Sequence, residues 1–438
     1  MKKLLYIVAV AALFLGMVRA GEERSLLFTE KELEAGGGCA AFSREGVYYC
    51  RVDIEYVADK PFSLVVKAPR NPFMGLWRQK LPASREPRRE TCDFALVIAP
   101  DNLEFRVEGG GERTIRRLAV ESIPRADYVS VTTIPDPLRK GSPRHAQIKK
   151  AYAAAPRNPV VLFGDSLTDN WRGARFAYMA TNFPVVNAGI CGDRIEHLLW
   201  RIEDMSGLLA SNPPSVATFL IGTNNLKLGT TAEDILLGVR HLVKTLRATC
   251  PETKIIVFAI PPRAFPWRKR HLDFTDCANI LLSTFAPCRG KEDKGVSFFD
   301  FSPLLLDADG VLIRPEYYEN DALHFSDKGY AEVVTPFVAG AIRLVTAKNL
   351  PPGYIARMGD WAMYLKGRFY DADYHFALEE QLAFESHRAA LPAHWMKVFA
   401  KLAADPGYTP EMPDEYLRME REEGLPDAFR QSISGNSE

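Results

Sequence analysis

The stretch VVLFGDSLTDNW, residues 160–171, decides the fold. Its first four residues are apolar, and a Gly-Asp-Ser turn follows them at residues 164–166. A short apolar run that ends in a turn signal is typical of a strand buried in a parallel sheet. Ligands of such sheets bind in the crevice beyond the carboxyl ends of the strands. Ser166 is therefore either the cap of a helix or a nucleophile.

Strands and helices alternate regularly around this stretch. The candidate strands are Pro159–Phe163, Val185–Ala188, Ser215–Leu220, Lys254–Ala259 and Val296–Phe299. Helical patterns fill the gaps, as in TAEDILLGVRHLVKTLRATC at residues 231–250, where Thr231 and Asp234 form a capping box. This alternation predicts a parallel sheet with helices on both faces, a three-layer α/β/α architecture.

The 438 residues are too many for one ordinary domain. Residues 21–131 favour strands, because YYCRVDIEYV (48–57) and LEFRVEG (103–109) alternate apolar and polar positions, and they predict a small β-sandwich-like domain. Residues 132–143, with three prolines and a glycine, indicate a linker. The α/β domain then covers residues 144–347. Residues 348–438 predict a helical C-terminal region.

The N-terminus has the pattern of a secretory signal peptide over residues 1–20. Lys2 and Lys3 precede an apolar run from Leu4 to Val18, and Ala20 offers a small residue for cleavage. The run is short for a bilayer span, although an uncleaved anchor is the alternative. We expect a secreted or periplasmic protein without a stable membrane span after cleavage. Lys plus Arg and Asp plus Glu both number 55, which gives no drive toward nucleic acid.

The seven cysteines permit disulfides in an exported chain, but their odd number leaves at least one free. Cys277 and Cys288 are candidates for a local disulfide, with two buried thiols as the alternative. No CxxC pair is present and the eight histidines are scattered, so we expect no structural zinc and no other metal.

Three further stretches place polar groups after predicted strands. They are VVNAGICGDR (185–194), ATFLIGTNN (217–225) and YENDALHFSDKGY (318–330). Each is unremarkable alone, since glycines make turns and asparagines cap helices. Together with Ser166 they bring a glycine amide, an amide side chain and an Asp/His pair to one edge of the sheet.

These groups are what hydrolysis of an acyl ester needs. A serine hydroxyl becomes a nucleophile when a neutral imidazole accepts its proton, and His324 offers one. Asp321 can fix the tautomer of that imidazole. The Ser166 amide, the Gly192 amide and the Asn224 side chain are the candidate donors of an oxyanion hole.

This set resembles the SGNH, or GDSL-type, hydrolase family. GDSLT, NAGICGD, GTNN and DALH correspond to the four family blocks, with Ser166, Gly192, Asn224 and the pair Asp321 and His324 at the functional positions. The resemblance covers residues 144–347 and is strongest to the subgroup of platelet-activating-factor acetylhydrolase catalytic subunits and bacterial carbohydrate deacetylases. It implies a flavodoxin-like α/β/α fold, serine esterase activity and no cofactor.

Two residues depart from the family pattern. Cys191 stands where serine is commoner, and Asn225 where aspartate is frequent. Neither change removes a catalytic group. Cys191 itself is a weaker nucleophile candidate than Ser166, because a thiolate needs a base or a positive environment. The GxSxG, Walker and HExxH motifs of other hydrolase classes are absent from the sequence.

We expect a secreted serine esterase that removes short acyl groups, acetyl above all, from a glycan. The segment PPRAFPWRKRHLDFTD (261–276) leaves the sheet at the same edge and carries the basic residues Arg263, Arg268, Lys269 and Arg270, beside Phe265 and Trp267. Such a segment suits a polar or anionic sugar, and a solvated surface loop or a contact with another domain is the alternative. The alternatives are a non-catalytic glycan-binding or adhesion protein and a lipase-like esterase for longer chains. The role of the β-rich domain and the oligomeric state stay open.

Overall fold

The computed structural model describes residues 25–28, 39–40, 47–67, 75–97, 103–108, 111–124, 127–227, 230, 232–264, 279, 282, 295–308, 310, 312–351, 354–355, 358, 390–414, 417–418 and 421. The predicted signal peptide, residues 1–20, lies outside these ranges, and so do Cys277 and Cys288. The chain divides into two compact units. Unit 1 comprises Met1–Ile134 and Asn225–Gly238, and unit 2 comprises Pro135–Asn224 and Val239–Glu438.

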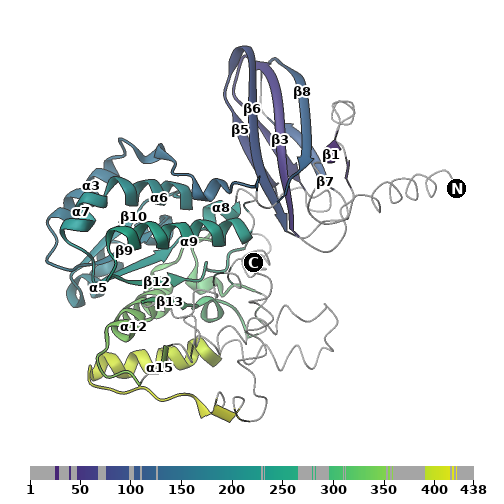
Figure 1. Ribbon diagram of the computed structural model, residues 1–438. Coiled ribbons are helices and arrows are strands. Elements are labelled where there is room, and N and C mark those ends of the chain that lie inside the picture. Colours follow the sequence, from purple (N-terminus) through teal and green to yellow (C-terminus); the bar gives the residue numbers. More distant parts are fainter. Residues whose placement is uncertain are drawn as a thin grey trace. The chain divides into compact units, whose positions relative to one another are not determined.

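Unit 1 contains two four-stranded antiparallel sheets (Figure 1). One has the strand order β1-β8-β3-β6 and the other β2-β7-β4-β5. The strands are β1 Ser25–Phe28, β2 Cys39–Ala40, β3 Val47–Ala58, β4 Phe62–Lys67, β5 Gly75–Leu81, β6 Ser84–Val97, β7 Leu103–Glu108 and β8 Arg113–Ser122. The predicted β-sandwich-like domain is therefore confirmed.

The core of unit 1 follows the alternation of its strands. Val52, Ile54 and Tyr56 on β3 are fully buried, while the residues between them are partly exposed. They pack against residues of the other sheet, including Phe62, whose ring lies edge-on to Tyr56 at 4.9 Å between centroids. Burial of one face per strand is what holds two such sheets together.

Unit 2 is built on a five-stranded parallel sheet with the order β10-β9-β11-β12-β13. The strands are β9 Val160–Gly164, β10 Val185–Gly189, β11 Val216–Leu220, β12 Lys254–Phe258 and β13 Val296–Phe299. The central strands β9 and β11 are buried along their whole length. The parallel α/β sheet expected from the sequence is confirmed, and each strand agrees with its predicted range to within one residue at each end.

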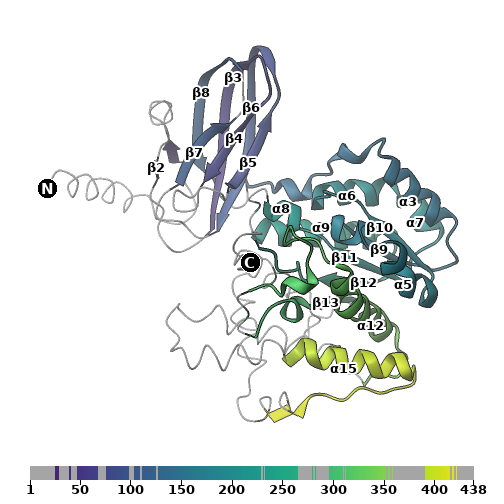
Figure 2. The same ribbon diagram turned by 180° about the vertical axis from the view of Figure 1, so that it is seen from behind.

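Helices cover both faces of this sheet (Figure 1, Figure 2). Helices α5 and α12 contact each other on one face, and α3, α6 and α7 lie on the other. Ser142 caps α3 by accepting a hydrogen bond from the His145 amide, and Pro143 occupies its first turn. The α-helices are α3 Pro143–Ala153, α4 Ser166–Asp169, α5 Ala177–Asn182, α6 Ile195–Asp204, α7 Ser206–Ser211, α8 Thr223–Lys227, α9 Ala232–Thr249, α11 Asp327–Gly329, α12 Thr335–Thr346 and α15 Ala390–Ala404.

Short 3₁₀ and π segments complete the described chain. They are η2 Val131–Thr133, η3 Pro137–Arg139, η4 Gly173–Phe176, η5 Ser302–Leu305, η6 Pro315–Tyr317 and the π-helical η7 Tyr330–Val334. Of these, η3 lies in the segment 132–143 that the sequence predicts to be a linker, and η2 overlaps its start.

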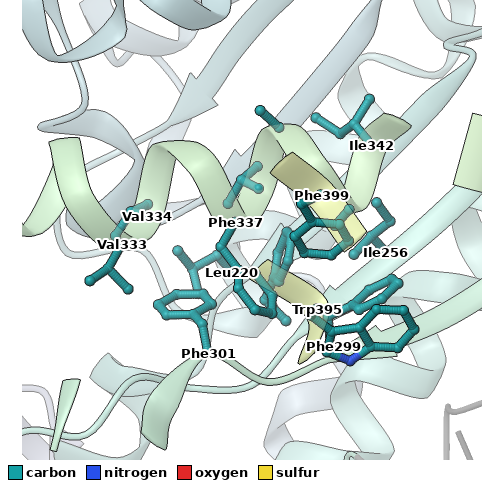
Figure 3. Packing of buried hydrophobic residues seen from close by; sticks show 14 of the residues in the cluster. Leu220, Ile256, Phe299, Phe301, Val333, Val334, Phe337, Ile342, Trp395 and Phe399 are labelled. Carbon is teal, nitrogen blue, oxygen red and sulfur yellow. The ribbon is translucent and has the colours of Figure 1, made fainter. Parts of the chain in front are cut away.

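The C-terminal helix α15 packs into the core of unit 2. Trp395 and Phe399 on α15 are buried against Phe299 of β13 and Phe337 of α12 (Figure 3). The rings of Trp395 and Phe399 are stacked on each other with centroids 5.7 Å apart. Aromatic pairs of this kind contribute about 0.5–1.5 kcal/mol each beyond the area that they bury. Helix α15, which lies in the region that the sequence predicts to be helical, therefore supplies part of the hydrophobic core.

Among the helices in the described ranges, none has both the length and the apolar character that crossing a bilayer requires.

The close approach of α15 to α12 gives a test of this packing. A Cβ atom on Gly340 of α12 would lie 2.0 Å from Cγ of Phe399, so Gly340→Ala should force the two helices apart. We expect a loss of about 1–3 kcal/mol in the free energy of unfolding, as for other overpacked cores. Gly207→Ala is the matched control, because nothing lies within 4 Å of its Cβ position in α7. Chemical denaturation should show no loss for the control, and an equally stable Gly340→Ala protein would contradict the packing described here.

Candidate active site

The carboxyl ends of three neighbouring strands lie level with one another. Gly164 at the end of β9 pairs in register with Gly189 of β10 and Leu220 of β11. A Cβ atom on Gly189 would lie 2.3 Å from the Asp169 amide, so the absence of a side chain lets α4 settle directly on the strand ends. Ser166 opens α4 two residues beyond β9, and it is 7% exposed.

The structure brings Ser166 together with His324 and Asp321. Oγ of Ser166 lies 2.8 Å from Nε2 of His324, although 158 residues separate them in the chain. Nδ1 of the same imidazole lies 2.5 Å from Oδ2 of Asp321. Since a carboxylate accepts hydrogen bonds, Nδ1 carries the proton and Nε2 is left to accept one from the Ser166 hydroxyl.

A tight loop between Tyr318 and Phe325 presents Asp321 and His324. The Glu319 amide donates to the His324 carbonyl at 2.7 Å, and Ala322 adopts a left-handed φ of 55° between them. Oδ1 of Asp321 accepts hydrogen bonds from the amides of Leu323 (3.0 Å) and His324 (2.9 Å). The sequence order Asp-x-x-His thus folds the carboxylate back onto the imidazole.

These hydrogen bonds keep Asp321 ionised. Burial alone would raise the pKa of Asp321, but the bonds from the His324 amide and imidazole and from the Leu323 amide outweigh it. The pKa of Asp321 therefore lies below its ordinary value. The side chain of His324 is 23% exposed and that of Asp321 is 46% exposed, so the pair faces an open part of the surface.

Gly192 and Asn224 follow β10 and β11 at the same edge of the sheet. Gly192 has a φ of +74°, a left-handed conformation that favours glycine, and it is exposed. Nδ2 of Asn224 donates to the carbonyl of Asp193 at 2.9 Å. An amide NH₂ carries two hydrogens, so this bond orients the Asn224 side chain and leaves a second N–H for another acceptor.

A buried charge network, which the sequence did not reveal, contacts the loop that carries Gly192. Asp193 is fully buried and pairs with Arg139 (Nε to Oδ1, 2.6 Å) and with Arg201 (Nη2 to Oδ2, 2.6 Å). Arg201 is itself fully buried on α6 and donates to the Ala188 carbonyl at 2.9 Å. The available signal was the position of this arginine three residues after Leu198, on the apolar face of an amphipathic helix.

A second carboxylate, Asp169, holds the start of the same loop. Its Oδ2 accepts a hydrogen bond from the Cys191 amide at 3.1 Å, and its Oδ1 pairs with Arg144 Nε at 2.9 Å. Arg144 also donates to the carbonyl of Asn187 in β10 at 3.0 Å. The loop that carries Gly192 is thus fixed on both sides by charge-assisted hydrogen bonds.

Cys191 is in a poor state to act as a nucleophile. Burial and the hydrogen bond to Asp169 raise its pKa to about 11, so the thiol stays protonated at neutral pH. Its Sγ lies 3.7 Å from Oδ1 of Asn170.

The first residues of the basic segment 261–276 connect two of the loops at this edge. Arg263 donates through Nη1 to the Thr223 carbonyl at 3.1 Å, immediately before Asn224. The same segment also contacts the loop that carries Asp321. The Tyr318 hydroxyl donates to the Pro262 carbonyl at 2.7 Å, and the Ala264 amide donates to the Ala322 carbonyl at 3.1 Å. Phe265, Trp267, Arg268, Lys269 and Arg270 lie outside the described residues.

A cavity of about 650 Å³ in unit 2 contains none of the predicted site residues. Its walls come from the η4–α5 segment, the segment around α12, and α15. It is lined by Ala174, Arg175, Tyr178, Asp327, Ala331, Thr335, Pro336, Arg343, Met396, Phe399, Ala400 and Ala403. Within the described ranges, no group of three or more His, Cys, Asp and Glu side chains is arranged to hold a metal ion.

Residues 162–332 match the family model described as the GDSL-like lipase/acylhydrolase family. Platelet-activating factor acetylhydrolase IB subunit alpha1 of Bos taurus is 29% identical over 196 residues, which are 43% of this chain and 76% of that protein. The alpha2 subunit of Rattus norvegicus is 29% identical over 190 residues, 41% of this chain and 75% of that protein.

Two solved structures are also similar to this chain. One is a GDSL-like lipase from Bacteroides thetaiotaomicron, with a TM-score of 0.34 and 19% identity over 42% of this chain and 91% of that one. The other is a carbohydrate esterase family 3 protein from Talaromyces cellulolyticus, with a TM-score of 0.32 and 18% identity over 42% of this chain and 97% of that one.

The buried Asp165, which precedes Ser166, yields a prediction about pH. Burial, only partly offset by the Leu167 amide, raises the pKa of Asp165 to about 7, whereas the unfolded chain ionises it near its ordinary value of about 3.9. The folded state therefore holds the Asp165 proton more tightly than the unfolded state does. The stability that this gives is complete below about pH 4 and is lost as the pH rises to about 7.

We expect the free energy of unfolding of the parent protein to fall relative to Asp165→Asn by up to about 1.4 kcal/mol per pH unit across this range. The asparagine amide keeps an oxygen that can accept the hydrogen bond from the Leu167 amide, so the variant is a matched control that does not titrate. Urea denaturation at pH 4.5, 5.5, 6.5 and 7.5 measures the difference. Parallel pH profiles for the two proteins would show that Asp165 is ionised in the folded state.

Proposed function

We propose that Ser166 is the nucleophile of this protein. The premise is that residues 162–332 belong to the GDSL-like lipase/acylhydrolase family and that the protein hydrolyses carboxylic esters. In this proposal His324 is the general base and Asp321 orients it. The observation that carries the assignment is the single imidazole that contacts both the Ser166 hydroxyl (2.8 Å) and the Asp321 carboxylate (2.5 Å).

The reaction follows from this geometry. Nε2 of His324 accepts the hydroxyl proton as Oγ of Ser166 attacks the ester carbonyl carbon, and Asp321 stabilises the imidazolium that forms. The tetrahedral intermediate collapses, the C–O bond to the alcohol breaks, and His324 returns the proton to the departing oxygen. Water then attacks the acyl-serine with His324 again as the base, which releases the carboxylic acid and restores Ser166.

The negative oxygen of the intermediate needs fixed donors. We assign this role to the amides of Ser166 and Gly192 and to the Asn224 side chain, all of which follow strand ends at one edge of the sheet. Each such donor lowers the barrier by about 3–4 kcal/mol in a site from which water is excluded. The bond from Asn224 to the Asp193 carbonyl supports this role, because it holds the amide before the substrate arrives.

We propose acetyl on a glycan as the substrate. The bovine and rat relatives are named acetylhydrolases, which supports a short acyl group. The exposure of His324 and Asp321 leaves room for a bulky alcohol. Arg263 lies near the carboxyl groups of Asp321 and Asp165, and this concentration of polar groups suits a polar sugar better than a lipid tail.

We also propose that the protein acts outside the cytoplasm, secreted or in the periplasm. The support is the sequence pattern of Lys2 and Lys3 followed by the apolar run from Leu4 to Val18. Unit 1, the β-sandwich, is then available to present a glycan to the enzyme or to serve as structural packing.

Replacement of the nucleophile is the first test. Ser166→Ala should abolish ester turnover and labelling by a fluorophosphonate probe, because it removes the only oxygen that attacks. Ser211→Ala, at the exposed end of α7, is the matched control and should react like the parent. Labelling of Ser166→Ala at the parental rate would refute the assignment.

Acyl-chain length tests the substrate. We expect kcat/KM for p-nitrophenyl esters to be highest for acetyl and to fall toward octanoyl, and acetate to be released from an acetylated polysaccharide. The reason is that the Asp321 carboxylate is exposed and that His324 and Arg263 are polar and partly exposed, so a long chain would gain little there of the roughly 0.8 kcal/mol per CH₂ that apolar burial gives. A steady rise in kcat/KM up to eight carbons would replace this proposal with a lipase-like esterase.

A further inference from the structure

Arg139 lies outside the matched residues 162–332, yet its guanidinium contacts the loop that carries Gly192. Nε pairs with Oδ1 of Asp193 at 2.6 Å, and Nη2 donates to the Cys191 carbonyl at 2.9 Å. One rigid, planar group therefore holds the residue before Gly192 and the residue after it.

The guanidinium also packs against Gly192 itself. A Cβ atom at Gly192 would lie 3.3 Å from Nη2 of Arg139. The left-handed φ of +74° at Gly192 is a conformation that the chain abandons easily when nothing holds it, because glycine has wide backbone freedom. The contacts of Arg139 with Asp193 and with the Cys191 carbonyl restrict the backbone at Gly192. The Gly192 amide can then keep the direction that an oxyanion-hole donor needs.

The far side of the loop is already fixed. Asp193 pairs through its other oxygen with the fully buried Arg201, and the Asp193 carbonyl accepts the hydrogen bond from Asn224. A change in the position of Asp193 therefore reaches both Gly192 and Asn224. Of the three charged side chains Arg139, Asp193 and Arg201, that of Arg139 is the most exposed, at 21%.

We propose that Arg139 is a positioning residue, which fixes the Gly192 amide and, through Asp193, the Asn224 side chain in the geometry of the oxyanion hole. The inference rests on the proposed function, because it assumes that these groups stabilise the tetrahedral intermediate. The inference means that a residue before the matched segment 162–332 helps to position the oxyanion-hole donors. A displacement of about 1 Å in a catalytic group can cost about 100-fold in rate.

The test compares Arg139→Ala, Arg139→Lys and Ser166→Ala with the parent. Lys149→Ala is the matched control, since Lys149 is a cation of the same unit that pairs with Asp204 at the surface. We expect Arg139→Ala to lower kcat for p-nitrophenyl acetate by about 10- to 100-fold with KM within about twofold, as for a loss of transition-state stabilisation. Lys149→Ala should keep the parental kcat.

A transition-state analogue separates positioning from a merely structural role. A trifluoromethyl ketone adds to the serine and places an oxyanion in the hole, so its Ki should rise by the same factor as kcat/KM falls. A lower kcat with an unchanged Ki would mean that part of the protein is unfolded, and it would overturn the inference. So would a parental kcat in Arg139→Ala.

Arg139→Lys keeps the test decisive if Arg139→Ala does not fold. Lysine keeps a positive charge beside the buried Asp193 but cannot span Asp193 and Cys191 as a planar fork does. We expect Arg139→Lys to have the parental denaturation midpoint, about a 10-fold lower kcat and a matching rise in Ki. If kcat and Ki both kept their parental values, the inference would be refuted. Parental turnover by Ser166→Ala would instead refute the proposed function, so the two failures are distinct.

Discussion

The register of the parallel sheet is the constraint on which the site depends. Gly164, Gly189 and Leu220 end three adjacent strands at one level, so the residues that follow them emerge side by side. The neighbouring strand β12 leads to Arg263, which braces the loop before Asn224. A slip of one residue in any strand would turn its buried side chains to the wrong face and move these groups apart. The geometry of the candidate site and the packing of the core are thus fixed by the same strand pairing.

Much of this arrangement could be predicted from the sequence, because the signals are local. The strand at Val160–Gly164 is an apolar run closed by a turn, and the Asp-x-x-His spacing predicts that Asp321 lies against His324. Arg201 and Arg139 were not predicted, although Arg201 lies on the apolar face of an amphipathic helix. An arginine is normally expected at the surface, and its burial here depends on Asp193, a partner in a loop whose position only the folded chain defines.

Burial of these charges is costly, which indicates what they do. Moving an ion pair into the interior gains little stability over a well-packed apolar pair of similar volume. Arg201 and Asp193 lie fully buried beside the loop at Gly192, where a displaced amide would disturb the site. Their directional hydrogen bonds select one loop conformation, which apolar contacts, lacking direction, do less sharply. We infer that the network serves precision more than stability.

The packing of α15 has a consequence for where this enzyme begins and ends as a folding unit. The homologous segment, residues 162–332, excludes Trp395 and Phe399, which cover the aromatic face of Phe299 and Phe337, and it also excludes the first two residues of β9. The limits of homology are therefore not the limits of cooperative folding. A fragment cut at the homologous boundaries would expose a broad aromatic surface to water, and such surfaces promote aggregation.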